Sequence, residues 1–289
     1  MDLTGTGIWS SGLRYGDAAQ AADAAAELDE LGYTAVWIPD VGGDVFAALV
    51  NLLGATTRMV VATGILNLWM HTPAETASAR AELLADHPGR LMLGLGVSHA
   101  PLIDSQEPGR YRKPLTRMRE YLDELDAAAP PVPRDERVLA ALGPKMLELA
   151  RERARGAHPY LAPPVNTARA RATLGDGPLL CPEQPVVLEA DPSEARRVAR
   201  FHLATYLGLP NYDRNHLRNG FTEDDLRNGG SDRLVDHLVA WGDEEAVRAR
   251  VQEHRDAGAD HVCVQVLTDD RTGLPRDAWR RLAPALGVR

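Results

Sequence analysis

The sequence predicts a TIM (β/α)8 barrel, with an open doubly wound sheet as the second possibility. Short apolar strands end in glycine at Gly64 and again at Gly94 and Gly96, with a helical stretch between them. A strand, a helix and a second strand in that order imply parallel pairing. A helix, a glycine and a buried strand also follow one another at residues 29–38 and 256–264. One barrel is ordinary for a chain of 289 residues.

The elements can be assigned in chain order from composition and from turn residues. Strands are expected at residues 5–9, 35–38, 59–63, 91–98, 138–142, 156–160, within 179–188 in an irregular form, and at 261–267. Helices are expected at residues 17–31, 44–55, 73–84, 114–128, 145–155, 165–174, 192–206 and 233–241. Residues 98–113 are expected to form a loop. Pro73 suits the first turn of its helix, and Glu75 favours the positive end of the helix dipole.

The stretch between the seventh and eighth strands is longer than one barrel helix requires. We expect one domain over residues 1–289, with an insertion at 205–236 near the barrel mouth. Its repeated Arg218-Asn219-Gly220 and Arg227-Asn228-Gly229 are typical of turns. The insertion could cap the mouth, or it could be a helical hairpin with no role in the site.

Composition excludes several classes of protein. The formal net charge of −9 disfavours nucleic acid as a partner. No segment has the roughly 20 consecutive apolar residues of a membrane helix. The start Met1-Asp2-Leu3-Thr4 has no basic or hydrophobic stretch, so we expect no signal peptide and a cytoplasmic protein. Cys181 and Cys263 are too isolated for a disulfide framework or a zinc site, and we interpret both as packing residues.

Four motifs carry a resemblance to a known family. Trp37-Ile38-Pro39-Asp40, Thr63-Gly64-Ile65-Leu66-Asn67, Leu93-Gly94-Leu95-Gly96-Val97-Ser98 and Ala141-Leu142-Gly143-Pro144-Lys145 occur in the family's order. Together they resemble the luciferase-like family, which includes FMN-dependent monooxygenases and oxidoreductases that use the deazaflavin coenzyme F420. The resemblance implies that the barrel mouth holds an isoalloxazine-like ring. It also implies a non-proline cis peptide at Gly64-Ile65 that supports one face of that ring.

The resemblance also implies which residues contact the cofactor. The helix start at Gly143-Pro144-Lys145-Met146 offers free N–H groups and a nearby cation to a phosphate. Ordinary helix initiation at Pro144 is the alternative. The complete set of cofactor contacts that we expect is Asp40, Thr63, Gly64, Ile65, Asn67, Gly96, Val97, Ser98, Gly143, Pro144, Lys145 and Met146. We expect no metal ligand.

One departure from the family concerns the proton. Family members often have histidine just after the second strand, but here Asp40 is followed by Val41-Gly42-Gly43. His71, His99 and Tyr160 are the candidate catalytic replacements, because histidine titrates near neutral pH and tyrosine can donate a proton. The two histidines could equally be supporting or solvent-facing loop residues. A basic mouth would suit the acidic tail of F420, and Arg110, Arg112, Lys113 and Arg117 cluster in the loop after the fourth strand.

The sequence therefore predicts a homodimeric oxidoreductase that moves hydride between coenzyme F420 and a small organic substrate. An FMN-dependent monooxygenase is the nearest alternative. A barrel that binds flavin without catalysis is an alternative of another class, and the missing histidine keeps it open. A barrel isomerase or aldolase would need a Schiff-base lysine in a strand. The only lysines, Lys113 and Lys145, lie outside the expected strands.

Overall fold

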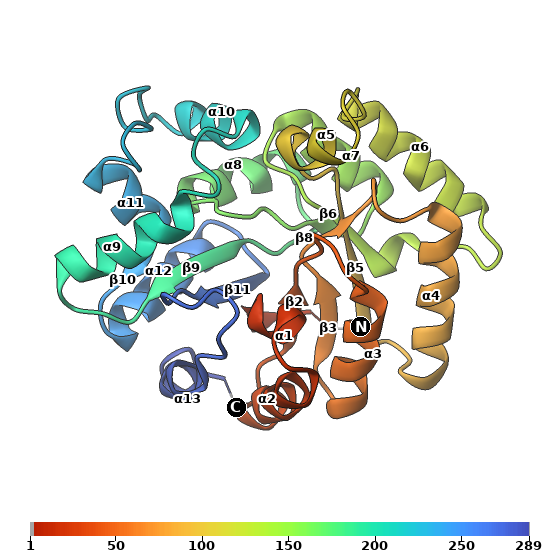
Figure 1. Cartoon of the computed structure of the whole chain (residues 1–289), viewed down its shortest axis with the longest axis horizontal. Coiled ribbons are helices and arrows are strands. Elements are labelled where there is room, and N and C mark those ends of the chain that lie inside the picture. Colours follow the sequence, from red (N-terminus) through yellow and green to blue (C-terminus); the bar gives the residue numbers. More distant parts are fainter. Residues whose placement is uncertain (1–2, 289) are drawn as a thin grey trace.

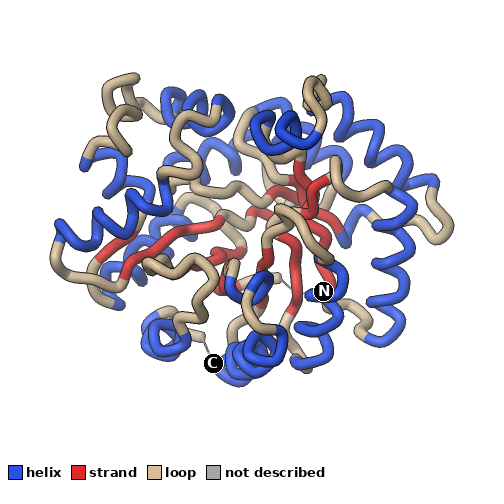
Figure 2. Tube along the Cα trace, viewed as in Figure 1, coloured by secondary structure: helices blue, strands red, loops and turns tan. Residues whose placement is uncertain are grey.

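The chain folds into a barrel of parallel strands surrounded by helices, as the computed structural model shows for residues 3–288 (Figures 1 and 2). Met1 and Asp2, on which the expected lack of a signal peptide partly rests, lie outside these described residues. The hydrogen-bonded order β11-β1-β2-β3-β5-β6-β7-β8 runs around the barrel, and every pairing is parallel. β9 follows β8 and pairs with β11, which closes the circle. The predicted TIM barrel is confirmed.

Eight positions around the barrel are occupied by these strands. They are β1 Gly5–Trp9, β2 Ala35–Ile38, β3 Val60–Thr63, β5 Leu91–Gly96, β6 Arg137–Leu139, β7 Gly156–Ala157, β8 Leu179–Leu180 with β9 Glu183–Val187, and β11 His261–Val266. Two short strands lie outside the circle: β4 Leu66–Asn67 pairs with β5, and β10 Ala240–Trp241 pairs with β9. The break between β8 and β9 contains Pro182, and it is the irregular form expected of the seventh strand.

Most of the helices begin at a capping side chain or with a proline in the first turn. The helices are α1 Gly12–Tyr15, α2 Ala18–Leu31, α3 Val45–Ala55, α4 Pro73–Asp86, α5 Ala100–Gln106, α6 Pro114–Ala127, α7 Pro144–Arg153, α8 Pro164–Leu174, α9 Pro192–Leu203, α10 Pro210–Arg218, α11 Asp232–Leu238, α12 Glu244–Asp256 and α13 Arg276–Ala285. Asp17 caps α2 by accepting from the Gln20 N–H, and α4 starts with a capping box between Thr72 and Glu75. Gly32, at φ 92°, ends α2 in the left-handed conformation.

Two predictions of local structure were wrong, and one helix was not delimited from sequence. Residues 98–113 contain α5, which begins with Pro101 in its first turn, rather than only a loop. The bounds of α10 within the insertion were not predicted, because its buried face includes Asn215 and His216 and shows no apolar pattern. The expected strands 138–142 and 156–160 are shorter, because the chain leaves the barrel at Leu139 and at Ala157.

The core has an inner and an outer part. Side chains that point into the barrel form one cluster that includes Trp9, Trp37 and Met92 together with Cys181 and Cys263. Both cysteines are fully buried and free, as expected of packing residues. A larger cluster lies between the strands and the helices. The barrel is therefore filled by side chains below its mouth, which leaves open space only at the ends of the strands.

The insertion and α9 pack on a second apolar core, which also includes Leu161, Val187 and Leu267 of the barrel. Residues of α9, α11 and the segment around Tyr212 form a separate apolar cluster. Figure 1 shows α10 and α5 at the same edge of the molecule, with α2 and α13 side by side at the opposite edge. The insertion thus lies beside the loops that follow β5. Within residues 3–288, no helix has both the length and the apolar character needed to cross a membrane.

Candidate active site

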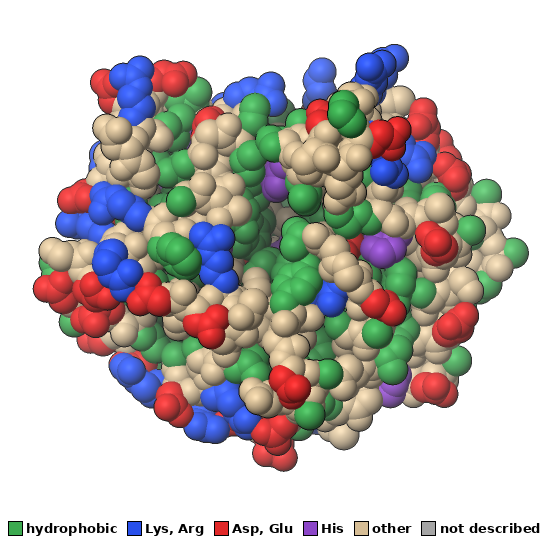
Figure 3. Space-filling model, in the orientation of Figure 1, with side chains coloured by type: hydrophobic (Ala, Val, Ile, Leu, Met, Phe, Trp, Pro, Cys, Tyr) green, Lys and Arg blue, Asp and Glu red, His purple; other side chains and the backbone are tan. Residues whose placement is uncertain are grey.

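A cavity of about 890 Å³ opens at the carboxyl ends of the barrel strands. Figure 3 shows a hollow in this face, bordered mainly by hydrophobic side chains, and Lys and Arg side chains along the upper edge of the molecule. The cavity wall is built from residues that follow β1, β2, β3, β5, β6 and β7, and from α10. Ligand sites of TIM barrels lie at this end, where several strands can each contribute a side chain.

The predicted site residues divide into those on the cavity wall and those behind it. On the wall are Asp40, Gly64, Ile65, Val97, Ser98, His99, Gly143, Pro144, Lys145, Met146 and Tyr160. Thr63, Asn67, His71 and Gly96 are not on the wall. The Thr63 hydroxyl donates to the Gly94 carbonyl oxygen at 2.8 Å, and Gly96 lies under the Ile65 side chain.

One side of the cavity is the bulge that follows β3. The Gly64-Ile65 peptide bond is cis, which confirms the conformation expected there. Trp9 Nε1 donates to the Gly64 carbonyl oxygen at 3.2 Å and so fixes the indole against the bulge. A Cβ on Gly64 would lie 2.5 Å from Trp9 Nε1, and one on Gly96 would lie 2.4 Å from the Ile65 side chain. Glycine at both positions lets the bulge pack tightly and leaves its surface open to the cavity.

The next strand exit brings polar backbone to the same wall. Ser98 has a φ of 55°, a conformation that turns the chain sharply after Val97. The Val97 carbonyl oxygen accepts from Trp69 Nε1 at 2.8 Å, and that of Ser98 accepts from the Tyr111 hydroxyl at 3.3 Å. These two bonds hold the exit of β5 in place beside the bulge.

The opposite end of the cavity is cationic. Gly143 occupies the N-cap of α7, and no side chain caps this helix start. Lys145, Arg214 and Arg218 line the cavity here, and Arg218 Nη2 lies 3.7 Å from the position of a Gly143 Cβ. Burial and the neighbouring guanidinium groups of Arg214 and Arg169 lower the pKa of Arg218. A helix start with three cations is a site for an anion.

These cations have no acidic partners in the part of the chain that the structure describes. Arg218 bonds only weakly to Asn215 Oδ1, at 3.4 Å, and Arg214 donates to the Pro210 carbonyl oxygen. By contrast, Arg110 and Arg117 of the loop cluster form ion pairs with glutamates and do not line the cavity. Among the described residues, the cations that line the cavity without an acidic partner are therefore those at α7 and α10.

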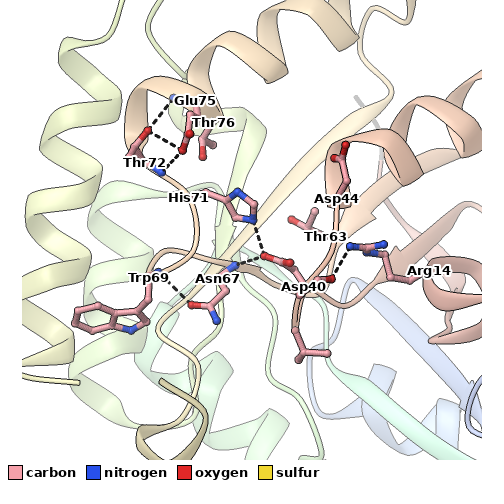
Figure 4. A network of polar contacts seen from close by, with 12 residues as sticks. Arg14, Asp40, Asp44, Thr63, Asn67, Trp69, His71, Thr72, Glu75 and Thr76 are labelled. Atoms are coloured by element: carbon pink, nitrogen blue, oxygen red, sulfur yellow. Dashed lines mark hydrogen bonds and ion pairs between the residues drawn. The ribbon is translucent and has the colours of Figure 1, made fainter. Parts of the chain in front are cut away.

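Asp40 connects the cavity to a histidine behind its wall (Figure 4). Its Oδ2 accepts from the Asn67 backbone N–H at 3.0 Å and lies 2.9 Å from His71 Nε2. Its Oδ1 is buried without a hydrogen-bond partner among the described residues. The His71 side chain is 15% exposed and packs edge-on against Phe46. The structure thus brings a histidine from the loop before α4 to the carboxylate that follows β2.

Tyr160 lies on the wall, but its hydroxyl group is already engaged. It donates to Gln265 Oε1 at 2.8 Å and accepts from the Tyr206 hydroxyl at 3.0 Å, with His202 Nε2 at 3.3 Å. Burial, followed by the proximity of Tyr206 and Glu183, raises the pKa of Tyr160 well above its usual range. A tyrosine with no nearby cation and a committed proton is a poor acid. Tyr160 therefore contributes its ring to the cavity wall and is not an evident proton donor.

His99 joins the exit of β5 to the insertion. Its ring lies 5.4 Å from that of Tyr212 on α10, and burial lowers its pKa against an opposing hydrogen bond with Asn211. Its Nδ1 is buried and has no partner among the described residues. Tyr212 also packs against Tyr206, which in turn packs against Tyr160. An aromatic wall therefore runs from the barrel to α10.

Several cavity residues were missed from sequence. They are Trp9, Tyr111, His158, Tyr206, Tyr212, Arg214 and Arg218. Trp9 and His158 had a signal, because each lies at a strand exit, as the predicted residues do. The residues of α10 had none, because only the tertiary packing of the insertion brings them to the mouth.

A family model described as luciferase-like monooxygenase matches residues 3–261. A protein of Mycobacterium tuberculosis provisionally assigned as a coenzyme F420-dependent oxidoreductase is 35% identical over 105 residues, which is 35% of this chain and 30% of that protein. An uncharacterized protein of Mycobacterium bovis is 32% identical over 109 residues, or 38% of this chain and 32% of that protein. The matched stretches thus span about a third of each relative.

Solved structures share the fold over nearly the whole chain. An F420-dependent secondary alcohol dehydrogenase with an F420-acetone adduct has a TM-score of 0.76, 17% identity and 99% coverage of both chains. The F420-dependent tetrahydromethanopterin reductase of Methanopyrus kandleri has a TM-score of 0.70 at 16% identity, covering 98% of each chain. The FMN-bound 3,6-diketocamphane monooxygenase component of Pseudomonas putida has a TM-score of 0.71 at 17% identity, covering 99% of this chain and 97% of that one. At these identities the similarity establishes the fold.

Proposed function

Because the chain belongs to the luciferase-like monooxygenase family, we propose that it is an oxidoreductase that transfers hydride between coenzyme F420 and a small organic substrate. One observation carries this proposal. A single cavity has the Gly64-Ile65 bulge on its wall and the uncapped start of α7 with Lys145 and Arg218 at its end. An isoalloxazine-type ring with a phosphate at the end of its side chain needs a flat apolar surface and an anion site in one cavity.

The residues present fit such a cofactor. Gly64 and Ile65 would support the ring, and Val97 and Ser98 would border it. Gly143 to Met146 of the α7 start would hold the phosphate, with Arg218 as an additional cation. The unpaired Asp40 Oδ1 offers an acceptor to a polar group of the bound molecules. When bound, the cofactor supplies the hydride chemistry, and the chain supplies binding, orientation and a dry pocket.

The insertion at 205–236 would help to exclude water. Thr205, Tyr206, Leu209 and Tyr212 line the cavity together with the barrel residues. We propose that this segment is the cap of the mouth rather than a hairpin without a role. A closed and mainly apolar cavity strengthens the electrostatic interactions within it.

Asp40 and His71 would handle the substrate proton. The histidine expected after the second strand is missing, but His71 Nε2 lies 2.9 Å from Asp40 Oδ2. Asp40 would contact the bound molecule through Oδ1, and His71 would hold the carboxylate in position from behind the wall. His99 is the second candidate, since it lines the cavity with an unpaired Nδ1. Tyr160 is the weakest of the three predicted residues, because its proton is donated to Gln265.

FMN-dependent monooxygenation is the second candidate function. It is favoured by one observation: Arg110 and Arg117, which argued for the acidic tail of F420, are paired with glutamates. The cavity fits either cofactor, and the preference for F420 over FMN rests on the Mycobacterium tuberculosis relative and on two of the three solved structures named above, the third being FMN-bound. A barrel that binds flavin without catalysis stays the alternative of another class. Homodimeric assembly and a cytoplasmic location stay predictions.

The phosphate site can be tested with Lys145→Ala. This variant should weaken FMN and F420 binding by about tenfold, because a partly solvated charge-assisted contact with a phosphate is worth roughly 1.5 kcal/mol. Riboflavin lacks the phosphate and should bind the variant and the wild-type protein equally. The measurement is a titration followed by fluorescence quenching.

Lys113→Ala is the matched control, because Lys113 is the only other lysine and lies outside the cavity wall. It should leave FMN binding unchanged. Adding Arg218→Ala to Lys145→Ala should weaken FMN binding further. Equal loss of riboflavin and FMN binding in Lys145→Ala would show that the residue supports the pocket and not the phosphate.

A further inference from the structure

We propose that His158 is a ligand-binding residue of this cavity, whose Nε2 accepts a hydrogen bond from an O–H or N–H group of the bound molecule. The proposal deepens the function proposed above and rests on it for the nature of the ligand. His158 follows β7 by one residue and lines the cavity. Its Nε2 lies 3.2 Å from the position of a Cβ on Gly64, so it borders the bulge.

The tautomer of His158 follows from its other nitrogen. Nδ1 lies 2.7 Å from the Cys181 carbonyl oxygen, which can only accept a hydrogen bond. Nδ1 therefore carries the proton, and in the neutral ring Nε2 presents a lone pair. Burial lowers the pKa of His158 to about 4, so the ring is neutral at physiological pH.

The ring is held in this orientation from behind. It stacks on Trp37 with a centroid distance of 4.3 Å and an interplanar angle of 13°. Trp37 is itself fixed, because its Nε1 donates to His261 Nε2 at 3.1 Å. Turning the imidazole over would break the bond to Cys181. The acceptor is therefore preorganised at the cavity wall before any ligand binds.

Nε2 of His158 is the part of this arrangement that nothing in the protein satisfies. It is buried and has no hydrogen-bond partner among residues 3–288. An unpaired buried acceptor costs free energy, and such atoms at a cavity wall are typically satisfied by a ligand. His216 is also buried and unpaired, but it does not line the cavity. The contrast makes His216 a matched control.

The lone pair selects the chemistry of its partner. It can accept from the imide N–H of an isoalloxazine-type ring or from the hydroxyl of an alcohol substrate. It cannot pair with a ketone oxygen or a carboxylate, which are acceptors only. The ring imide and the alcohol hydroxyl would each place a hydrogen-bond donor next to the bulge. Binding measurements distinguish these two donors.

The test compares His158→Leu and His158→Gln with the wild-type protein and with His216→Leu. Fluorescence quenching measures the binding of FMN, N3-methyl FMN and F420. Cyclohexanol and cyclohexanone are then titrated into the F420 complex. The same two compounds are added to the apo protein, where a thermal shift reports their binding. His158→Leu removes the acceptor, and His158→Gln restores one through its amide oxygen. His158→Phe, which can keep the stacking on Trp37, replaces His158→Leu should that variant not fold.

If the cofactor ring is the donor, His158→Leu weakens FMN and F420 binding about tenfold, and N3-methyl FMN binds wild type and variant alike. If the substrate is the donor, His158→Leu binds both cofactors normally. Its affinity for cyclohexanol is about tenfold lower than that of the wild-type protein, and its affinity for cyclohexanone is unchanged. Partial rescue by glutamine and no effect of His216→Leu support either case. Binding of FMN, F420 and cyclohexanol by His158→Leu within twofold of wild type overturns the proposal. If the wild-type protein binds neither cofactor, the proposed function is wrong. The proposal for His158 is then tested by comparing cyclohexanol binding to the wild-type and His158→Leu apo proteins.

Discussion

Gly64→Ala is expected to weaken F420 and FMN binding by about 100-fold while the barrel stays folded. The new Cβ would lie 2.5 Å from Trp9 Nε1, a distance that real Cβ atoms essentially never show, and 3.0 Å from Trp9 Cδ1, which is also tight. Trp9 is 5% exposed and its indole is rigid, so it must move as a whole. Overpacking of this kind costs roughly 1–3 kcal/mol, and it displaces two parts of the cavity wall together. Fluorescence titration measures the loss.

Gly54→Ala is the matched control for this substitution. Gly54 is an exposed residue of α3, and a Cβ there would meet nothing within 4 Å. Alanine should raise the stability by up to about 1 kcal/mol through helix propensity and leave cofactor binding unchanged. Circular dichroism and thermal unfolding of both variants separate a damaged site from a damaged fold. Normal cofactor binding by folded Gly64→Ala would remove the bulge from the site.

Acid is expected to unfold the protein well before its exposed carboxylates are protonated. Four fully buried histidines have a lowered pKa, chiefly through burial: His158 and His216 to about 4, His254 and His261 to about 3. The unfolded chain binds protons on them below pH 6.5, the ordinary histidine value, and the folded chain does not. The contribution of these neutral histidines to the free energy of unfolding is complete above pH 6.5 and is lost as the pH falls below it. At pH 5 each histidine lowers the free energy of unfolding by about 2 kcal/mol.

Glu183 acts in the opposite direction. Burial raises its pKa to about 8, so it is protonated when folded and its contribution is lost as the pH rises toward that value. It offsets part of the histidine effect on acidification. The free energy of unfolding should still fall by on the order of 5 kcal/mol between pH 7 and pH 5, comparable to the whole stability of many domains. Urea unfolding at the two pH values measures it.

His216→Leu isolates the histidine contribution. Both ring nitrogens of His216 are buried without partners among the described residues, so leucine breaks no hydrogen bond. The free energy of unfolding of the variant should equal that of the wild-type protein at pH 7. Between pH 7 and pH 5 it should fall by about 2 kcal/mol less than that of the wild-type protein. A free energy of unfolding that is equal at pH 7 and pH 5 in the wild-type protein would contradict the account of these buried rings.

The barrel could be predicted because its signals are local. Gly32 ends α2 in the left-handed conformation, and the apolar run Ala35–Ile38 that follows is buried along its whole length. The same pattern of a helix, a left-handed glycine and a buried strand places Gly258 before β11. The shortest strands were harder to delimit, since β7 has only two residues. A Cβ on Gly156 would lie 1.8 Å from the Leu179 carbonyl oxygen, so close approach of the backbones, and not side-chain pattern, defines that strand.

The site could be predicted only where a strand exit supplied it. Asp40, Gly64, Ser98 and Gly143 all line the cavity, because parallel strands end at one mouth. The hydrogen bond between Asp40 and His71 joins residues 31 apart, and no sequence spacing specifies it.

The insertion was hidden for a different reason. Arg218 reaches the α7 start through a helix whose buried face carries Asn215 and His216, so its sequence resembles a polar loop. Only the packing of the insertion against the second apolar core brings that helix to the mouth. The sequence motifs therefore point to the ring-binding side of the cavity, and the folded chain adds the second set of cations and the aromatic wall.

The proposed cofactor is tested by titration of the purified protein with F420 and, separately, with FMN. Quenching of cofactor fluorescence reports binding, and added riboflavin reports how far the phosphate contributes. The account predicts saturable binding of F420, tighter than that of FMN, with both tighter than riboflavin. Binding of FMN in preference to F420 would move the protein to the monooxygenase branch of the proposal, and binding of neither would contradict the proposed redox function.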